Sequence, residues 1–147
     1  MPLISRNALV PYSVEEMYQL VEDIEAYPEF LPWCRATEVL SKTDDEVKAS
    51  IDIAKGALNK SFTTINRMQK NKMIEMHLLQ GPFKHLEGFW RFDALKTEQA
   101  SKISFDLDFE FESKIMAFAA GTIFNQIANS MVDAFSKRAI EVYGERI

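Results

Sequence analysis

The side chains best suited to catalysis or metal binding are few and scattered in this sequence. Two histidines, His77 and His85, and the single cysteine, Cys34, have no nucleophile or base close to them along the chain. Neither a Gly-x-Ser-x-Gly elbow nor a glycine-rich phosphate loop occurs. The alternating acids of residues 106–112 could bind a hard cation, but a solvated strand face is the simpler interpretation. We therefore predict no catalytic residue, no metal site and no required cofactor.

A basic segment inside an acidic chain suggests that the protein could bind phosphate groups. The net charge is −5, which argues against a DNA-binding protein. Residues 54–72 nevertheless hold five cations and no acid, and such a cluster could contact nucleic-acid phosphates. An ordinary solvated hairpin is the alternative interpretation. The five cations are Lys55, Lys60, Arg67, Lys70 and Lys72.

Two aromatic segments could bind apolar molecules. Residues 27–34 read YPEFLPWC, and their two prolines predict a rigid loop. The rings of this loop either plug one end of the core, or form a pocket lid or an apolar docking surface for a partner or membrane. Residues 81–92 read GPFKHLEGFWRF, which predicts a Gly-Pro turn followed by an aromatic strand.

Hydrophobic periodicity predicts the elements that position these segments. A first strand at 3–9 precedes a capping box at Ser13 and Glu16, which starts a short helix over 14–21. A second short helical piece runs through 22–26 and ends at the prolines. From residue 35 onward apolar residues alternate with polar ones, as in half-buried strands. Turn signals separate these strands at residues 42–46, 55–56, 70–72, 81–82 and 96–100.

In residues 114–143 the apolar residues return to helical spacing. Apolar residues, among them Ile115, Phe118 and Phe124, recur every three or four positions from Lys114 to Tyr143. They predict a helix of about 45 Å with one wide apolar face. Such a helix needs a large apolar surface, and the Phe-rich face of the sheet is the only candidate. We therefore predict a single α+β domain over 1–147 with a helix-grip fold. It comprises a curved antiparallel sheet of about seven strands around the long C-terminal helix, and two short helices after the first strand.

A sheet that closes on a helix can leave a pocket between them. The predicted inward faces mix bulky with small or polar groups, such as Gly88 beside Trp90, and Thr64 and Asn66 beside Phe62. A well-packed core is the alternative. The residues expected to form the tunnel or its lid are Tyr27, Pro28, Phe30, Leu31, Pro32, Trp33, Phe62, Phe83, Trp90, Phe92, Phe105, Phe109, Phe124, Ile127 and Met131.

Four motifs in order resemble the coenzyme Q-binding, START-like family, also called polyketide cyclase/dehydrase-like. They are PLISRNALVPYS, YPEFLPWC, GPFKHLEGFWRF and LDFEFESK, and the resemblance covers nearly the whole chain. It is closest to the bacterial ribosome association toxins of that family. The resemblance implies a helix-grip fold with a hydrophobic tunnel. Mitochondrial members are ubiquinone-binding chaperones needed for respiration, whereas the bacterial toxins are described as binding the large ribosomal subunit and blocking its joining with the small one.

Two functional hypotheses result. The first, implied by the resemblance, is a non-enzymatic, cytoplasmic, bacterial protein that binds the large ribosomal subunit, with the five cations of residues 54–72 as its possible contact with ribosomal RNA. The alternative is a lipid chaperone that holds ubiquinone or another isoprenoid. One cysteine is consistent with a reducing compartment. The longest mostly apolar stretch, 115–124, is shorter than the ~20 residues of a membrane span, so no integral membrane segment is expected. Peripheral membrane contact is compatible with the sequence.

Overall fold

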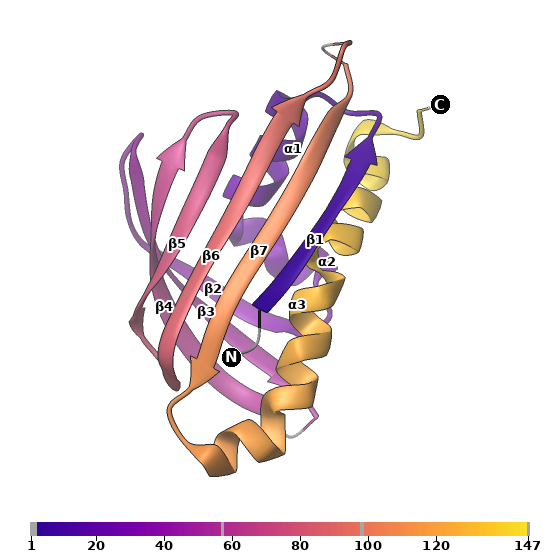
Figure 1. Ribbon diagram of the computed structural model, residues 1–147. Coiled ribbons are helices and arrows are strands. Elements are labelled where there is room, and N and C mark those ends of the chain that lie inside the picture. The colour runs from indigo at the N-terminus through magenta and orange to yellow at the C-terminus, as the bar shows by residue number, and fades with distance from the viewer. Residues whose placement is uncertain (1–2, 57, 98, 147) are drawn as a thin grey trace.

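Seven strands form one antiparallel sheet in the computed structural model, which describes residues 3–56, 58–97 and 99–146 (Figure 1). The spatial order of the strands is β1-β7-β6-β5-β4-β3-β2. Along the chain the elements are β1 (Leu3–Val10), α1 (Val14–Glu22), a 3-10 turn (Ile24–Ala26), α2 (Tyr27–Phe30), β2 (Cys34–Lys42), β3 (Glu46–Lys55), β4 (Leu58–Gln69), β5 (Met73–Gln80), β6 (Phe83–Ala94), β7 (Ser101–Phe111) and α3 (Lys114–Tyr143).

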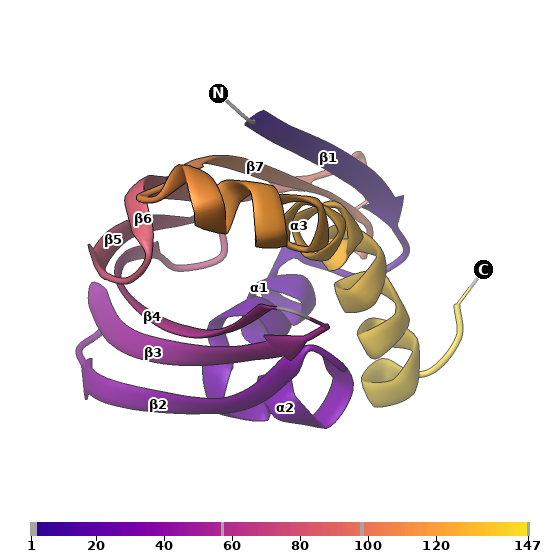
Figure 2. The same ribbon diagram turned by 90° about the horizontal axis from the view of Figure 1, so that it is seen from below.

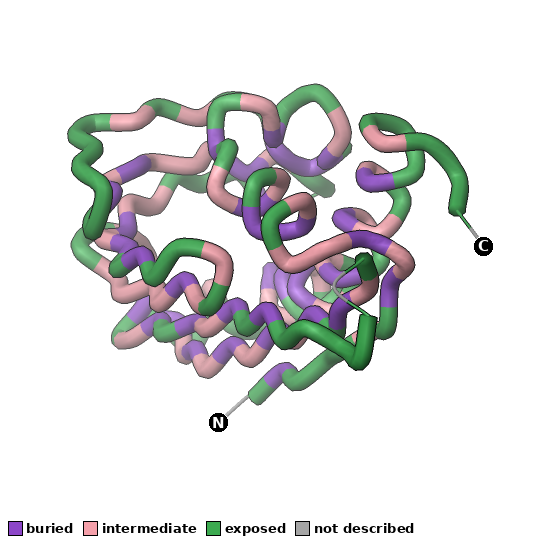
Figure 3. Tube along the Cα trace, turned by 90° about the horizontal axis from the view of Figure 1, so that it is seen from above, coloured by how far each residue is buried: buried purple, intermediate pink, exposed green. Residues whose placement is uncertain are grey.

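The sheet curls around α3, which confirms the predicted helix-grip arrangement (Figure 2). Burial alternates along β7, where every second residue from Ser101 to Phe111 is buried, as a strand with one face toward the core requires (Figure 3). Helix α3 contributes buried residues spaced mainly by three or four positions. These are Ala120, Phe124, Ile127, Ala128, Val132, Phe135 and Ala139.

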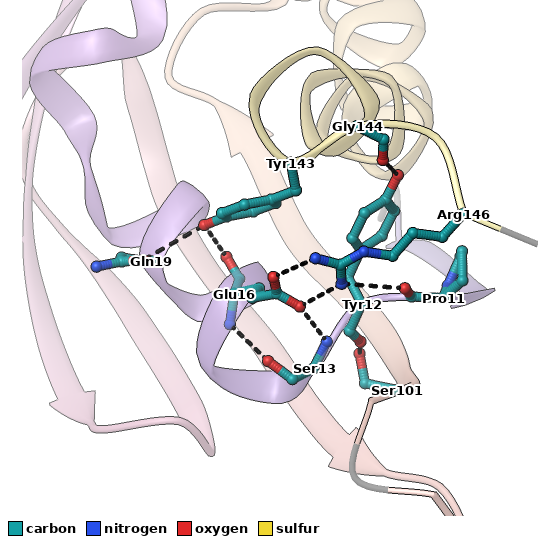
Figure 4. Close-up of polar contacts among 9 residues, drawn as sticks. All are labelled: Pro11, Tyr12, Ser13, Glu16, Gln19, Ser101, Tyr143, Gly144 and Arg146. Atoms are coloured by element: carbon teal, nitrogen blue, oxygen red, sulfur yellow. Dashed lines mark hydrogen bonds and ion pairs between the residues drawn. The ribbon is translucent and has the colours of Figure 1, made fainter.

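The C-terminal end of α3 is fastened to α1 by a polar network (Figure 4). Arg146 donates to both carboxylate oxygens of Glu16, at 2.7 and 2.8 Å. The hydroxyl of Tyr143 donates to the Glu16 carbonyl at 2.9 Å, and that of Tyr12 donates to the Gly144 carbonyl at 2.6 Å. The hydrogen bond from Arg146 lowers the pKa of Glu16, so this carboxylate stays ionised and paired to a lower pH than an ordinary glutamate would.

The first helices differ in part from the sequence prediction. The capping box at Ser13 and Glu16 is confirmed, and it begins α1. The prediction that residues 27–30 form a loop is wrong, because they form the short helix α2. Pro28 lies in the first turn of α2, where a backbone N–H has no intrahelical partner, so this proline is compatible with the helix and does not interrupt it.

The N-terminal turns of α3 also differ from expectation. The apolar spacing placed Ile115 and Phe118 on the face toward the sheet, but their exposed fractions are 82% and 93%. Ala120 is buried, and a residue two positions away lies about 200° around the helix. Phe118 therefore points outward because this part of the helix is apolar on both sides, and spacing alone does not identify the inner side.

Candidate functional site

A small, mostly apolar cavity lies between α3 and the concave face of the sheet. Its volume is about 70 Å³. Its polar side chains include Thr64 and Asn66, both buried, and the Thr64 hydroxyl donates to the Asn66 side-chain oxygen at 2.8 Å. The lining residues are Ile24, Tyr27, Trp33, Ile51, Ile53, Phe62, Thr64, Asn66, Met76, Leu86, Trp90, Phe105, Leu107, Phe124, Ile127, Ala128 and Met131.

Eight of the residues expected at the tunnel or its lid line this cavity. They are Tyr27, Trp33, Phe62, Trp90, Phe105, Phe124, Ile127 and Met131. Four others are buried in the core without lining it: Leu31, Phe83, Phe92 and Phe109. Pro28 and Pro32 are exposed, and Phe30 is half-buried.

Nine lining residues were not on the predicted list. Thr64 and Asn66 had been recognised as polar groups on an inward face, and period-two alternation from Phe62 and Trp90 also finds Leu86. The contributions of Ile24 and Ala128 depend on how the first helices and α3 pack over the sheet. Neither residue lies in a strand, so period-two alternation could not predict that they line the cavity.

Aromatic rings fill much of the space that the sequence assigned to a tunnel. In one cluster Phe83 stacks on Phe111 with ring centroids 4.9 Å apart, and it lies 5.1 Å from Phe124. In another, Trp90 lies 4.5 Å from Phe105 and 5.2 Å from Phe135. The remaining cavity of about 70 Å³ is roughly half the ~150 Å³ of an apolar cavity that accepts benzene. In this conformation a whole isoprenoid quinone does not fit.

The YPEFLPWC segment contributes mainly to the core. The hydroxyl of Tyr27 donates to the Val21 carbonyl, and the ring contacts Phe135 at 5.5 Å. The ring of Phe30 packs against that of Phe135, with the centroids 5.2 Å apart, and it lies under the guanidinium of Arg138. This arrangement favours the plug that the sequence left as one of two alternatives.

Cys34, at the end of that segment, is unsuited to nucleophilic chemistry. It is buried, and burial together with the charge of Asp52 raises the pKa of its thiol to about 11. The thiol therefore stays protonated at neutral pH.

The five predicted ribosome-contact cations are all exposed, but they form two groups rather than one. Lys55 and Lys60 flank the β3–β4 turn, whereas Arg67, Lys70 and Lys72 lie at the β4–β5 turn. Lys60 and Arg67 are seven residues apart on one strand, a separation of about 23 Å. The continuous basic segment of the sequence is therefore divided between opposite ends of β4.

Acidic residues from other strands lie beside the second group. The cross-strand neighbours of Arg67 are Glu46 on β3 and Glu75 on β5. Lys70 borders a surface groove of about 940 Å³ between α1 and two hairpin turns, together with Asp44 and Asp45. The segment that is acid-free in sequence is thus not acid-free in space, and the Lys55–Lys60 end retains the clearer positive character.

The remaining candidate residues make ordinary strand-surface contacts. His77 pairs with Glu75 at 2.9 Å, and His85 with Asp108 at 3.2 Å. Asp106, in the acidic stripe, accepts a hydrogen bond from Ser5 at 2.6 Å. Within the part of the chain that the structure describes, no group of three or more His, Cys, Asp or Glu side chains is arranged to hold a metal ion.

The gripped helix and the apolar cavity beneath it define a START-like, helix-grip protein. The chain belongs to the polyketide cyclase / dehydrase and lipid transport family, whose model matches residues 10–136. It is 48% identical over 146 residues to the ribosome association toxin RatA of Escherichia coli K12, covering 99% of this chain and 92% of that protein.

Two further relatives show the breadth of this family. The mitochondrial coenzyme Q-binding protein COQ10 homolog B of Xenopus laevis is 27% identical over 150 residues, covering 97% of this chain and 59% of that protein. The solution structure of the 18 kDa protein CC1736 from Caulobacter crescentus superimposes with a TM-score of 0.76 at 28% identity, covering 99% of this chain and all of the other.

Proposed function

We propose that this protein acts in the cytoplasm as a ribosome association toxin: it binds the large ribosomal subunit and blocks its joining with the small one, and it catalyses no reaction. The observation that carries the proposal is the 48% sequence identity with RatA, which extends over 99% of this chain. A steric block of this kind requires a specific surface and no catalytic group, which agrees with the absence of a predicted catalytic set.

The two ends of β4 make different contributions to subunit binding in this proposal. Lys55 and Lys60 contact ribosomal RNA phosphates. Each phosphate that they neutralise releases counterions, so this contact strengthens binding most at low salt. Arg67 contributes less, because Glu46 and Glu75 on the adjacent strands offset its positive potential.

Sedimentation with purified large subunits across a salt series tests this proposal. The wild type should co-sediment at low salt, and Lys55→Glu/Lys60→Glu should weaken binding and flatten its salt dependence. The control is Lys102→Glu/Lys137→Glu, which changes the same total charge at two exposed lysines on β7 and α3.

A light-scattering assay of subunit joining provides the functional result. Wild-type protein should inhibit joining, the Lys55/Lys60 variant should inhibit poorly, and the control should act like wild type. Failure of the wild type to co-sediment at low salt would refute the proposal.

We infer a second candidate function, the binding of an isoprenoid quinone such as ubiquinone, from the cavity and the COQ10 relative. Thr64 and Asn66 supply polar groups that could hydrogen-bond a quinone carbonyl within an otherwise apolar wall. Because the cavity is about 70 Å³, binding requires that aromatic rings or α3 move outward. Quinone binding should therefore be sensitive to added bulk inside the cavity.

Mass spectrometry of organic extracts, from protein purified without detergent, tests the second candidate, together with uptake of added ubiquinone. Ala128→Leu places extra bulk in the cavity and should abolish uptake. Ala119→Leu adds the same bulk at an exposed position of the same helix and should not. Absence of any quinone or lipid from the extracts, with no uptake by the wild type, would exclude this function.

A further inference from the structure

The N-terminal turns of α3 carry an apolar surface that the proposed functions do not use. Ile115 and Phe118 lie three positions apart, on the outward side of the helix, with exposed fractions of 82% and 93%. Phe118 is the most exposed large hydrophobic residue among those that the structure describes. Two neighbouring, nearly fully exposed side chains of this size are typical of an interaction surface.

The helix that carries these residues is unusually apolar. Residues 115–132 contain no charged side chain. By length and composition α3 could cross a membrane, a property it shares with core helices, yet only 28% of its most apolar 18-residue stretch is buried. Its inner side packs on the sheet through Phe124 and Ile127. The exposed apolar side chains of its N-terminal half are confined to residues 115–119, since the exposed positions that follow are polar.

Two lysines lie near the N-terminal half of this helix. Lys114 precedes Phe118 by four positions and so lies on the same side of the helix. The β3–β4 turn, with Lys55, approaches the helix closely, because a Cβ placed on Gly56 would lie 3.1 Å from Ile123.

The β5–β6 turn and the start of α3 also lie at this end of the molecule (Figure 2). The β5–β6 turn is followed by Lys84, which pairs with Glu110 at 3.5 Å, and Glu112 precedes α3. The four lysines Lys55, Lys60, Lys84 and Lys114 and the three acids Asp52, Glu110 and Glu112 give these residues a net charge of +1, in a chain of net charge −5.

We propose that this end of the protein docks on an anionic lipid bilayer. Phe118 and Ile115 insert among the acyl chains at the interface, while Lys114 and Lys55 lie against the anionic headgroups. An exposed apolar strip bordered by lysines is the pattern of helices that lie in a membrane interface.

Other occupants fit these observations less well. A two-fold contact between copies of this chain would bring the lysines of both copies together, which is unfavourable. An RNA surface would neutralise the lysines but would not provide the acyl environment that Phe118 and Ile115 require. The proposed surface is separate from the cavity. It shares Lys55 with the proposed ribosome contact, but Phe118, Ile115 and Lys114 belong to neither candidate function.

Vesicle sedimentation tests this inference, using vesicles of phosphatidylcholine alone and of phosphatidylcholine with phosphatidylglycerol. The wild type should partition into the anionic vesicles, and Phe118→Gln should lower the partition coefficient about tenfold or more. Lys114→Gln should reduce the preference for phosphatidylglycerol. Since Phe118 is 93% exposed, its replacement should leave the melting temperature unchanged.

Ile140→Gln is the matched control, because Ile140 is an exposed apolar residue near the other end of α3 and should not affect partition. The inference is overturned if the wild type stays in the supernatant with both vesicles, or if Phe118→Gln binds as tightly as wild type. It is also overturned if the wild type is a dimer that Phe118→Gln converts to a monomer, or if this substitution weakens only large-subunit binding.

Discussion

Gly81, in the turn between β5 and β6, should not tolerate even a methyl group. Its φ of +156° lies in a region that residues with a Cβ rarely adopt. A Cβ built at this position would lie 2.6 Å from the Cβ of Phe62 and 3.3 Å from its Cα. Neither atom can rotate away, because both belong to the β4 backbone or are attached directly to it. Gly81→Ala must therefore displace either β4 or the turn between β5 and β6.

The two effects set the expected magnitude. An unfavourable backbone conformation costs about 1–3 kcal/mol, and overpacking a core position costs about 1–3 kcal/mol. We expect Gly81→Ala to lower the free energy of unfolding by about 3 kcal/mol, which corresponds to a fall in melting temperature of about 6–12 °C. Thermal and urea unfolding monitored by circular dichroism measure both quantities.

Gly121 provides a matched control within the same protein. It lies in α3, and a Cβ there would meet nothing within 4 Å. Gly121→Ala should therefore raise the free energy of unfolding by about 0.5–1 kcal/mol, since alanine is the better helix former. The same substitution is thus expected to have opposite signs at the two glycines.

A double-mutant cycle with Phe62→Ala examines the cause of the Gly81 effect. Alanine retains the Cβ of Phe62, so the clash persists and the two substitutions should be nearly additive. The reasoning would be refuted by a Gly81→Ala variant within 1 kcal/mol of wild type, or by a coupling energy above about 1 kcal/mol. The latter would assign the contact to the aromatic ring.

Three further predictions concern ionisation and packing. The pKa of Glu16 is lower in the folded state than the ordinary 4.5, so its pairing with Arg146 stabilises the fold above that pH and is lost as the pH falls through the folded value; Glu16→Gln should flatten the acid limb of a plot of melting temperature against pH. Cys34, with a thiol pKa of about 11, should resist iodoacetamide at pH 8 in the native protein and react after unfolding, and rapid native alkylation would contradict its burial. Phe124→Ala should cost about 3–5 kcal/mol in urea unfolding, because it removes a buried ring that contacts Phe83 and Phe109, and a cost below 1 kcal/mol would mean that the aromatic cluster is loosely packed.

The regular elements could be predicted from the sequence because each is encoded by a local pattern. The alternation of apolar and polar residues that begins at residue 35 identified strands such as β7, and the long three-four spacing identified α3 from Lys114 to Tyr143. The 27–34 segment was less clear, because prolines occur both in loops and in the first turn of a helix. Here the second case applies, and Pro28 lies in the first turn of α2.

The candidate site depends on tertiary packing that no local pattern encodes. The position of inward residues such as Phe62 and Trp90 followed from alternation, but the size of the cavity depends on how rings from five elements fill the interior. The charge of the 54–72 segment likewise depends on its neighbours, because β3 and β5 place Glu46 and Glu75 beside Arg67.

The sequence by itself determined the family, the strand and helix pattern, and the types of residue on the inward faces, since these follow from motifs and from period-two and three-four spacing. Only the tertiary structure decided which apolar residues of α3 are buried. Phe124 and Phe118 belong to the same apolar helix, yet one lies in the core and the other is 93% exposed. The reason is that spacing fixes the directions of side chains relative to one another, whereas the docking of α3 on the curved sheet selects which direction is inside.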